Sequence, residues 1–380
     1  MVVILFWASV CLLMYIYLGY PLLVFLIGAI RRRKVRKEIQ YPPVSIVIAA
    51  YNEEAHIRKT IENKLSLEYP KERLDIVVVS DGSTDGTDGI VETFRGQDVR
   101  LLRQEPRQGK TAALNLVVRE AVGDIIVFSD ANSIYSRDAV KKLVANFSDE
   151  TVGYVTGKLI FGLPDGTTVG GGCTRYMRYE NLLRESESRI GSIVGVNGGI
   201  DAVRKILYEP MTPDQIPDFI LPLKVVEKGY RVVYEPDAVL REDALEQASD
   251  EYRMRVRVAL RSLNAILDMK HLMNPFRYGL FAWQFLSHKT LRYLAFLFLV
   301  VAYASNLVLS PRGGIYLVTL SAQTIFYLSA LVGWIAERTK TENGIFFVPF
   351  YFCLLNMASA DAFVKMLQGR RQVVWNPRKG

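Results

Sequence analysis

The feature that most limits how this chain can fold is an uncharged run of 29 residues at its start, Val2–Ile30. An α-helix rises about 1.5 Å per residue, so about 20 apolar residues are enough to cross the hydrocarbon core of a bilayer. The run is far longer than the apolar core of a cleaved signal, and no basic residue precedes it. We therefore expect residues 1–30 to form a transmembrane helix.

Six of the seven residues in the segment Arg31–Lys37 are basic. Positive flanks of a membrane helix tend to stay in the cytosol, so the N-terminus should face outward and the chain after residue 30 should face the cytosol. The whole chain has 47 Lys and Arg against 39 Asp and Glu, a formal net charge of +8. Because positive charge gathers directly after an apolar run, we interpret residues 31–43 as a basic linker at the lipid headgroups. We expect the lipid bilayer as a partner and no nucleic acid.

The C-terminal third of the chain is apolar again. The stretches Tyr293–Pro311 and Gly313–Ala336 carry no charge over 19 and 24 residues, and Asn343–Ala360 adds 18 more before Asp361 and Lys365 follow. This pattern predicts a transmembrane region over residues 291–367 with two to three spans, after basic and interfacial helices over 251–290 and before a basic tail over 368–380. Three spans would place the basic tail outside, whereas a re-entrant last stretch would keep it in the cytosol. The sequence leaves both topologies open.

Residues 44–250 have the pattern of a water-soluble α/β domain, which should lie in the cytosol. Short β-branched runs alternate with segments of helical spacing, which is typical of a mostly parallel sheet covered by helices on both faces. The expected strands are Val44–Ala49, Asp75–Ser80, Val99–Leu102, Ile125–Ser129 and Arg231–Tyr234, and the expected helices are Glu53–Leu67, Lys110–Ala121 and Asp138–Phe147.

Three of the expected strands end in polar turns that carry acids. These turns contain Asn52 and Glu53, then Asp81, then Asp130. Open α/β sheets bind ligands at the carboxyl ends of their strands, where acids can accept hydrogen bonds from a nucleoside or hold a divalent cation on a diphosphate. Each turn alone has an ordinary alternative, since Asp81-Gly82 is a common turn pair and Asn52 could cap the following helix. Three such turns at successive strand ends favour a binding site.

A basic turn opens the helix expected at residue 110. Arg107-Gln108-Gly109-Lys110-Thr111 places a lysine beside a helix N-terminus, which favours phosphate because free N–H groups add to the ammonium charge. It is not a Walker A loop, since Gln104 stands where that motif needs glycine. The chain has neither the G-x-G-x-x-G of dinucleotide enzymes nor the G-x-S-x-G of serine hydrolases. Its three histidines and three cysteines are scattered, which argues against a zinc site or a disulfide scaffold.

Together these motifs resemble the family-2 glycosyltransferases, which have the GT-A fold. The resemblance rests on Val44–Glu54, on Val78–Thr87 and on Ser129–Asn132, which sits where the family has its D-x-D metal motif, and it covers about residues 44 to 245. The flanking apolar segments are similar in layout to the bacterial membrane-bound synthases of hyaluronan, poly-N-acetylglucosamine and cellulose. The resemblance implies that the nucleobase and ribose are contacted by Ala50, Tyr51, Glu53 and Asp81, and that Lys110 contacts the nucleotide. It also implies that Asp130 and Asn132 hold Mg²⁺ or Mn²⁺ at the sugar diphosphate. By the same resemblance, Asp218 is the general base.

The chain departs from the family pattern at three places. Asn132 replaces the second acid of D-x-D, and Pro217 replaces the acid that commonly precedes the base. Asp214, four residues earlier than Asp218, is the alternative residue for part of that role. The Q-x-x-R-W signature of processive synthases is reduced to Met254–Val258, which retains Arg257. The ordinary alternative for Asp218 is a helix N-cap after Pro217.

Arginines recur every four residues at Arg253, Arg257 and Arg261 and should share one face of a helix. Like charges at this spacing repel, so an anion beside them is favourable. We expect Arg257 to contact the nucleotide diphosphate, and a basic face toward lipid headgroups is the alternative. The glycine-rich segment Ser192–Gly199 falls where the family has its acceptor loop, and Glu180, Arg184 and Glu187 on the preceding helix are interpreted as structural.

The sequence thus predicts a multi-pass protein of the inner (plasma) membrane with a cytosolic GT-A domain. By the resemblance, it moves a sugar, expected to be UDP-linked, from a nucleotide-diphosphate donor to a saccharide or lipid-linked acceptor with inversion, in polysaccharide or exopolysaccharide biosynthesis. The alternative is a non-catalytic membrane scaffold that retains a nucleotide-binding fold.

Overall fold

A computed structural model describes residues 1–162, 168–243, 248–339 and 345–373. The chain divides into two compact units. The helical unit comprises Met1–Ile27, Phe161–Tyr179 and Asp243–Arg370. The α/β unit comprises Gly28–Ile160, Glu180–Glu242 and Arg371–Gly380.

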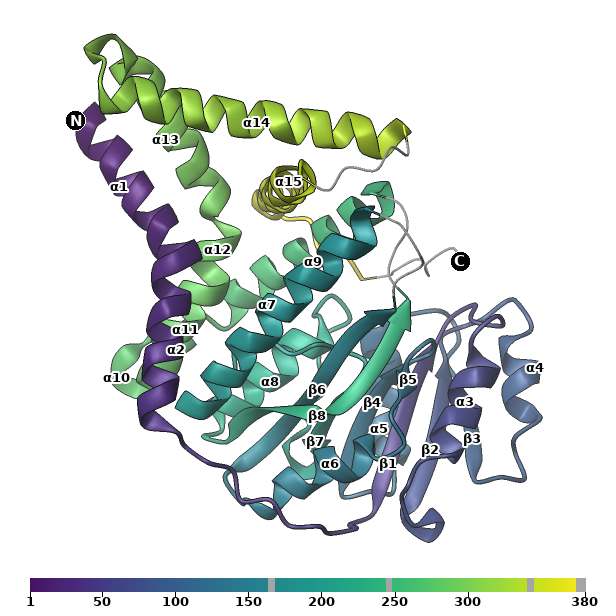
Figure 1. Ribbon diagram of the computed structural model, residues 1–380. Coiled ribbons are helices and arrows are strands. Elements are labelled where there is room, and N and C mark those ends of the chain that lie inside the picture. The colour runs from purple at the N-terminus through teal and green to yellow at the C-terminus, as the bar shows by residue number, and fades with distance from the viewer. Residues whose placement is uncertain (163–167, 244–247, 340–344, 374–380) are drawn as a thin grey trace. The chain divides into compact units, whose positions relative to one another are not determined.

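The described residues form one mixed sheet of eight strands (Figure 1). The strands lie in the order β3 (Val99–Arg103), β2 (Leu74–Ser80), β1 (Val44–Ala50), β4 (Ile125–Asp130), β7 (Asp201–Arg204), β6 (Val152–Gly162), β8 (Arg231–Asp243) and β5 (Ile134–Tyr135). Strands β3, β2, β1 and β4 are parallel, and β7 runs antiparallel to both β4 and β6. All seven residues of β1 are buried, as expected of a central parallel strand covered on both faces.

The order of the parallel strands creates a switch point beside β1. The chain moves outward from β1 to β2 and β3 through α3 (Ile57–Leu65) and α4 (Thr87–Glu92), and then returns across the sheet to β4 through α5 (Lys110–Glu120). Because such crossovers are right-handed, α3 and α4 cover one face and α5 covers the other, where it packs on β1 and β2. The carboxyl ends of β1 and β4 therefore border the crevice where sheets of this kind bind ligands.

The expected strands of the first half are confirmed with small changes at their ends. Other expectations were wrong in extent. The helix expected from Glu53 begins only at Ile57, and Asn52 does not cap it, because Asn52 has a positive φ of 52° and binds the next turn instead. The strand expected at Arg231–Tyr234 continues to Asp243. Two further helices of the α/β unit, α6 (Ala139–Ala145) and α8 (Pro217–Glu227), follow β5 and β7.

The other unit is built mainly of helices. Its helices are α1 (Val2–Met14), the π-helical turn η1 (Tyr15–Gly19), α2 (Tyr20–Arg31), α7 (Thr168–Ile190), α9 (Ala248–Asp268), α10 (Pro275–Tyr278), α11 (Leu280–Gln284), the π-helical turn η6 (Phe285–Thr290), α12 (Leu291–Tyr293), α13 (Ala295–Leu309), α14 (Ile315–Thr339) and α15 (Phe347–Leu367), with α2 and α7 ending in the α/β unit. Helix α1 packs on α13, and α15 packs on both α14 and α9.

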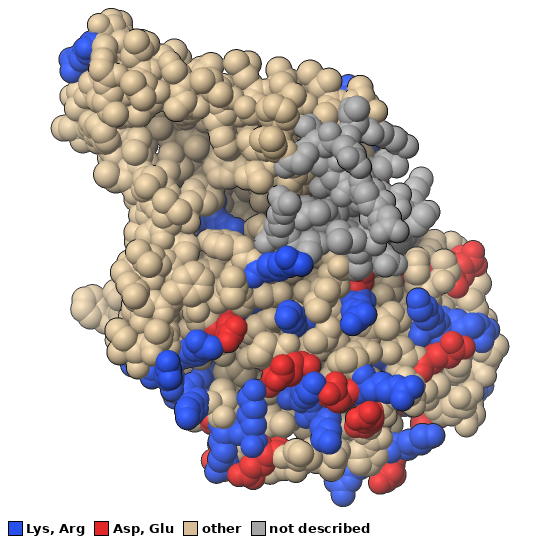
Figure 2. Space-filling view, in the orientation of Figure 1, with Lys and Arg blue, Asp and Glu red and all other residues tan. Residues whose placement is uncertain are grey.

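Within the described ranges, four helices are long and apolar enough to cross a membrane: Val2–Arg31, Ala295–Arg312, Ile315–Thr339 and Phe347–Leu367. The visible surface of the helical unit is almost uncharged, whereas Lys, Arg, Asp and Glu crowd the surface of the α/β unit (Figure 2). An uncharged surface of this extent is unfavourable in water.

Candidate active site

The turns after β1 and β2 are bound to each other by side chains. The Asn52 side-chain oxygen accepts a hydrogen bond of 2.8 Å from the Thr84 amide, and the Glu53 amide donates to the Thr87 hydroxyl at 2.8 Å. The main-chain carbonyl of Ala50 accepts a 2.9 Å bond from the Asp81 amide. The two polar turns predicted from the sequence therefore form one rigid edge of the crevice.

Asp81 is the centre of this edge. Its side chain is almost fully buried, and its carboxylate accepts hydrogen bonds from the Gln104 side chain at 2.6 Å and from the amides of Gln108 and Gly109 at 2.9 Å each. Gly109 has a φ of +92°, a conformation that favours glycine. The carboxylate thus fixes the turn that opens α5. A role of Asp81-Gly82 as an ordinary turn pair does not account for these hydrogen bonds.

The Arg107 side chain lies between two residues predicted to contact the nucleoside. Its guanidinium carbon is 3.4 Å from the centre of the Tyr51 ring, and its Nε is 3.6 Å from a carboxylate oxygen of Asp81. A planar cation stacked on an aromatic ring is a favourable contact. Arg107 therefore lies on the ring of Tyr51 and beside the carboxylate of Asp81.

Lys110 and Asp130 form an ion pair across the crevice. The ammonium of Lys110, the first residue of α5, donates to the carboxylate of Asp130, the last residue of β4, and both side chains are partly exposed. Burial would lower the pKa of Lys110, but the carboxylates of Asp130 and Asp218 outweigh it, so this pKa lies above its ordinary value. The site therefore holds a fixed positive charge where the sequence predicts a phosphate.

Asp218 lies in the first turn of α8, directly after a loop that α5 holds in place. The Thr111 hydroxyl donates to the carbonyl of Gln215 at 2.7 Å, and the Asn115 amide donates to the carbonyl of Met211 at 2.6 Å. Asp218 is the second residue of α8, and Ile216 is the N-cap, so the capping alternative for Asp218 was wrong. The glycine-rich segment lies directly against this carboxylate, because a side-chain carbon at Gly198 would be only 2.7 Å from Oδ2 of Asp218.

A second buried acid, Asp201 on β7, lies within electrostatic range of Asp218 and Lys110. Thr156 and Tyr154 hydrogen-bond to its carboxyl group, yet its Oδ1 has no partner, and the residue is only 1% exposed. Burial raises the pKa of Asp201 to about 7, and the charge of Asp218 adds to the rise. An acid in this environment stays protonated well above the usual range of aspartate.

This raised pKa predicts a pH-dependent effect of Asp201→Asn on stability. Between about pH 4 and 7 the unfolded chain releases a proton that the folded protein keeps, so the wild-type free energy of unfolding falls as the pH rises. The asparagine variant lacks this loss. Its free energy of unfolding relative to that of the wild type should therefore rise by on the order of 2 kcal/mol from pH 5 to pH 8. Unfolding midpoints of both proteins at the two pH values measure the gain. Asp98→Asn, at an exposed site, is the control, and an equal difference at both pH values would contradict the prediction.

The protein itself offers few ligands for a metal ion. In the part of the chain that the structure describes, no group of three or more His, Cys, Asp or Glu side chains could hold one. Asp130 and Asn132 offer a carboxylate and an amide oxygen, and Asp130 already pairs with Lys110. Mg²⁺ is commonly bound by one or two carboxylates together with substrate phosphates, so these residues fit an ion that shares its ligands with a diphosphate.

Arg257 and Asp214 were also considered from the sequence. Arg257 is a half-buried residue of α9 in the helical unit, and its contact with the diphosphate stays a prediction. The three arginines of α9 differ in exposure, since Arg253 is 80% exposed and Arg261 is 7% exposed, so they do not form one solvated face. Asp214, suggested as a partner of the base, forms an ion pair of 2.6 Å with Arg371.

The helix residues interpreted as structural hold the glycine-rich segment. Arg184 lies 4.0 Å from Glu180 in a buried pair, and its Nε donates to the carbonyl of Gly195 at 2.9 Å. Glu187 accepts a 3.2 Å bond from the Val194 amide. Their structural role is therefore confirmed, and it is exerted on the loop beside Asp218.

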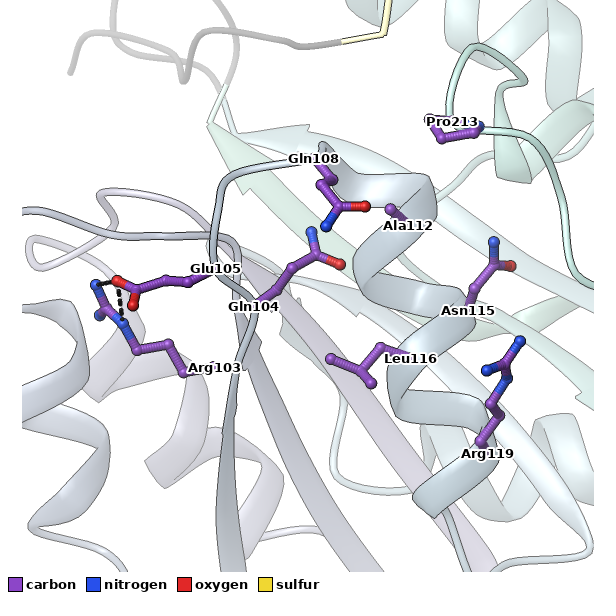
Figure 3. Close-up of a pocket in the computed structure, with 9 residues that line it drawn as sticks. All are labelled: Arg103, Gln104, Glu105, Gln108, Ala112, Asn115, Leu116, Arg119 and Pro213. Carbon is purple, nitrogen blue, oxygen red and sulfur yellow. Dashed lines mark hydrogen bonds and ion pairs between the residues drawn. The ribbon is translucent and has the colours of Figure 1, made fainter.

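A pocket of about 440 Å³ opens on the outer side of this region (Figure 3). Asn115, Arg119 and Pro213 line it, and none of the predicted site residues does. It adjoins the site through Gln104 and Gln108, which contact Asp81, and through Asn115, which holds the loop before Asp218. We place the site at the strand ends, where the charged groups converge, and not in this pocket.

Reasoning from the sequence missed several residues of the site. Gln104 and Arg107 act through contacts with Asp81 and Tyr51, and Asp201 lies in a strand of four residues that no pattern indicated. The basic turn at Arg107–Thr111 was the only signal that pointed to one of them.

The strand order and the acids at both sides of the switch point define a GT-A domain, the fold of nucleotide-sugar transferases. One solved structure, the mannosyltransferase PcManGT from Pyrobaculum calidifontis in complex with GDP-Man and Mn²⁺, has the same fold with a TM-score of 0.72 and 24% identity, over 97% of this chain and 100% of that one. Residues 45–193 match the model of glycosyl transferase family 2. These residues of the chain therefore form a glycosyl transferase family 2 domain.

Two curated relatives differ in how much of this chain they match. The probable glycosyltransferase YdaM of Bacillus subtilis is 31% identical over 242 residues, which cover 60% of this chain and 56% of YdaM. The poly-beta-1,6-N-acetyl-D-glucosamine synthase of Staphylococcus epidermidis is 24% identical over 357 residues, which cover 87% of this chain and 85% of the synthase. The chain thus spans about half the length of the first relative and most of the second.

Proposed function

We propose that this chain is a membrane-bound inverting glycosyltransferase that moves a sugar from a nucleoside-diphosphate donor to a hydroxyl of a saccharide or lipid-linked acceptor. The observation that carries the proposal is the series of contacts that joins Asp81 through Gly109 to Lys110 and Asp130, with Asp218 in range of the same lysine. Three acids from three separate parts of the sequence are thus linked through Gly109 and Lys110. Lys110 and Asp201, whose pKa values are both raised, lie within electrostatic range of Asp218, and perturbed titratable groups that converge in this way are typical of active sites.

The proposed reaction uses Asp218 as the general base. Its carboxylate takes the proton of the acceptor hydroxyl, whose oxygen attacks the anomeric carbon opposite the diphosphate. The new bond to the acceptor oxygen forms as the bond to the diphosphate oxygen breaks, and the electron pair stays with the departing nucleoside diphosphate. Lys110 stabilises the negative charge of this leaving group.

Asp130 and Asn132 would hold Mg²⁺ or Mn²⁺, which supplies further positive charge to the diphosphate oxygens. At the other end of the donor, the ring of Tyr51 and the polar edge around Asp81 and Glu53 would hold the nucleoside. UDP-linked sugars are our first choice of donor, and GDP-linked sugars come second because PcManGT was solved with GDP-Man. The similarity to the poly-N-acetylglucosamine synthase over most of the chain supports a role in polysaccharide biosynthesis.

The four apolar helices support a location in the inner (plasma) membrane with the α/β unit in the cytosol. The tail after α15 supports two crossings in the C-terminal region. Arg371 pairs with Asp214 of the α/β unit, and a side-chain carbon at Gly109 would lie 2.8 Å from the carbonyl oxygen of Val373. If the tail is on the same side of the membrane as the α/β unit, the chain after Glu242 must cross the membrane an even number of times.

Helix α15 is the segment that we assign as not crossing. It packs along α9, where Ala358 and Ala362 share a buried cluster with Leu260 and Leu263. It also carries the ion pair of Asp361 and Lys365 at 3.0 Å, an unfavourable feature for a lipid-facing span. Helices α13 and α14 then form the two C-terminal crossings.

Cysteine labelling tests this topology. In a background without native cysteines, Gln372→Cys should react with an impermeant maleimide only after the cells are opened, because the tail is cytosolic. Arg312→Cys, between α13 and α14, should react in intact cells and is the positive control. Labelling of Gln372→Cys in intact cells would instead mean three C-terminal crossings.

A panel of UDP- and GDP-linked sugars tests the proposed function. The purified full-length protein with Mn²⁺ and a membrane extract as acceptor should release free nucleoside diphosphate from at least one donor. No release and no transfer from any donor would favour the alternative of a non-catalytic scaffold. Product length then separates a processive synthase, which makes polymer, from an enzyme that adds a single sugar.

A further inference from the structure

The turn that carries Asp130 and Asn132 is held from one side by helix α3. The Thr60 hydroxyl donates to the carbonyl of Ala131 at 2.6 Å, and the Lys64 amine donates to the carbonyl of Ser133 at 2.6 Å. The Asn63 side chain donates to the carbonyl of Tyr135 at 2.9 Å and accepts from its amide at 2.8 Å.

These contacts have a regular geometry. Residues 60, 63 and 64 lie on one face of a helix, since positions three and four apart are neighbours. Their three partners are alternate carbonyls of the turn, at residues 131, 133 and 135. Helix α3 therefore fixes the path of the main chain on both sides of Asn132.

Lys64 is the unusual member of this face. It is 0% exposed, and its ammonium nitrogen also lies 3.1 Å from Oδ1 of Asn63 and 3.5 Å from the centre of the Tyr135 ring. Burial lowers the pKa of Lys64, and the carboxylates of Glu242 and Asp130 oppose that shift. The amine has N–H groups to donate in either protonation state.

A buried lysine is costly, and an apolar residue of similar length would fill the same space without desolvating an amine. Packing alone therefore gives no reason for lysine at this position. The reason that the contacts offer is the 2.6 Å bond to the main chain between Asn132 and Tyr135.

We propose that Lys64, together with Thr60, is a positioning residue that sets the turn at 131–135 so that Asp130 and Asn132 present their oxygens to the cation and diphosphate of the donor. The inference rests on the proposed function. It predicts that changes in α3 alter the metal-dependent part of nucleotide binding.

The test measures the binding of UDP and GDP to the purified full-length protein, with Mn²⁺ and with EDTA, by titration calorimetry. Lys64→Met keeps the length of the side chain and removes the hydrogen bond. It should weaken Mn²⁺-dependent binding about tenfold or more, since supporting residues of metal ligands carry 10–100-fold effects, and leave the affinity in EDTA unchanged. Lys59→Met, the same change at an exposed position of the same helix, is the matched control and should bind as the wild type does.

Thr60→Val removes the neighbouring bond with little change in shape and should have the same selective effect, to a smaller degree. It decides the question if Lys64→Met does not fold. Wild-type affinity for Mn²⁺ and nucleotide in the folded variants, or an equal loss with and without Mn²⁺, would overturn the inference. If the wild type itself binds no nucleotide, the proposed function fails, and the inference fails with it.

Discussion

Asp218→Asn is expected to reduce sugar transfer by about 10³-fold or more while leaving nucleotide binding nearly intact, because a general base contributes about 10²–10⁴-fold and an amide cannot accept the proton. The substitution preserves size, and Asp218 lies at the glycine-rich segment and not at the edge formed by Asp81 and Tyr51. The loss should therefore appear in kcat, with the Kd of the nucleoside diphosphate unchanged.

The measurement is steady-state turnover with the donor found in the panel, together with a nucleotide titration of the same preparation. Asp214→Asn is the matched control, since Asp214 lies in the loop directly before α8 but pairs with Arg371. Near-normal turnover of Asp218→Asn would end the assignment of the base. A large loss in Asp214→Asn alone would move that role to Asp214.

Lys110→Met is expected to reduce kcat by about 10²–10³-fold, the magnitude found when one preorganised group that stabilises developing charge is removed. The variant loses the cation that faces the leaving group and also leaves the carboxylate of Asp130 without its ion-pair partner. Nucleoside-diphosphate affinity should fall as well, whereas affinity for the nucleoside should stay the same.

Comparing UDP with uridine, or GDP with guanosine, separates these two effects of Lys110→Met. Lys110→Arg retains the charge and should recover part of the lost turnover. Lys71→Met, an exposed lysine of the same unit, is the control. An equal loss for nucleoside and nucleotide would mean that Lys110 supports the fold of the crevice and does not act on phosphate.

The parallel half of the sheet could be predicted from the sequence because its signals are local. Strands β1, β2 and β4 are continuous β-branched runs that end in turn residues, and the acids at their ends follow directly in the sequence. In the antiparallel half, only the start of β8 was predicted. Strands β5 and β7 were missed because they have two and four residues and owe their conformation to partners far away in the chain. Short strands of this kind have little propensity of their own.

The same distinction applies to the site. Asp81, Lys110 and Asp130 could be proposed because each stands at a turn whose chemistry is visible in the sequence. Lys64 could not, since in the printed sequence it is one more lysine in an amphipathic helix, and only the fold places it under another turn. Asp201 is similar, because its environment is set by Thr156 of the neighbouring strand and by Asp218.

The stacking of Arg107 on Tyr51 has a consequence for donor recognition. In the proposed site, a nucleobase that seeks the ring of Tyr51 competes with a guanidinium already lying on it. The measured binding free energy would then reflect the difference between stacking of the nucleobase and stacking of Arg107 on the Tyr51 ring. It would not report the strength of the nucleobase contact alone. A ligand must therefore displace Arg107 from the ring, and stacking alone does not favour this. A diphosphate that contacts Lys110 at the same time supplies the additional binding free energy.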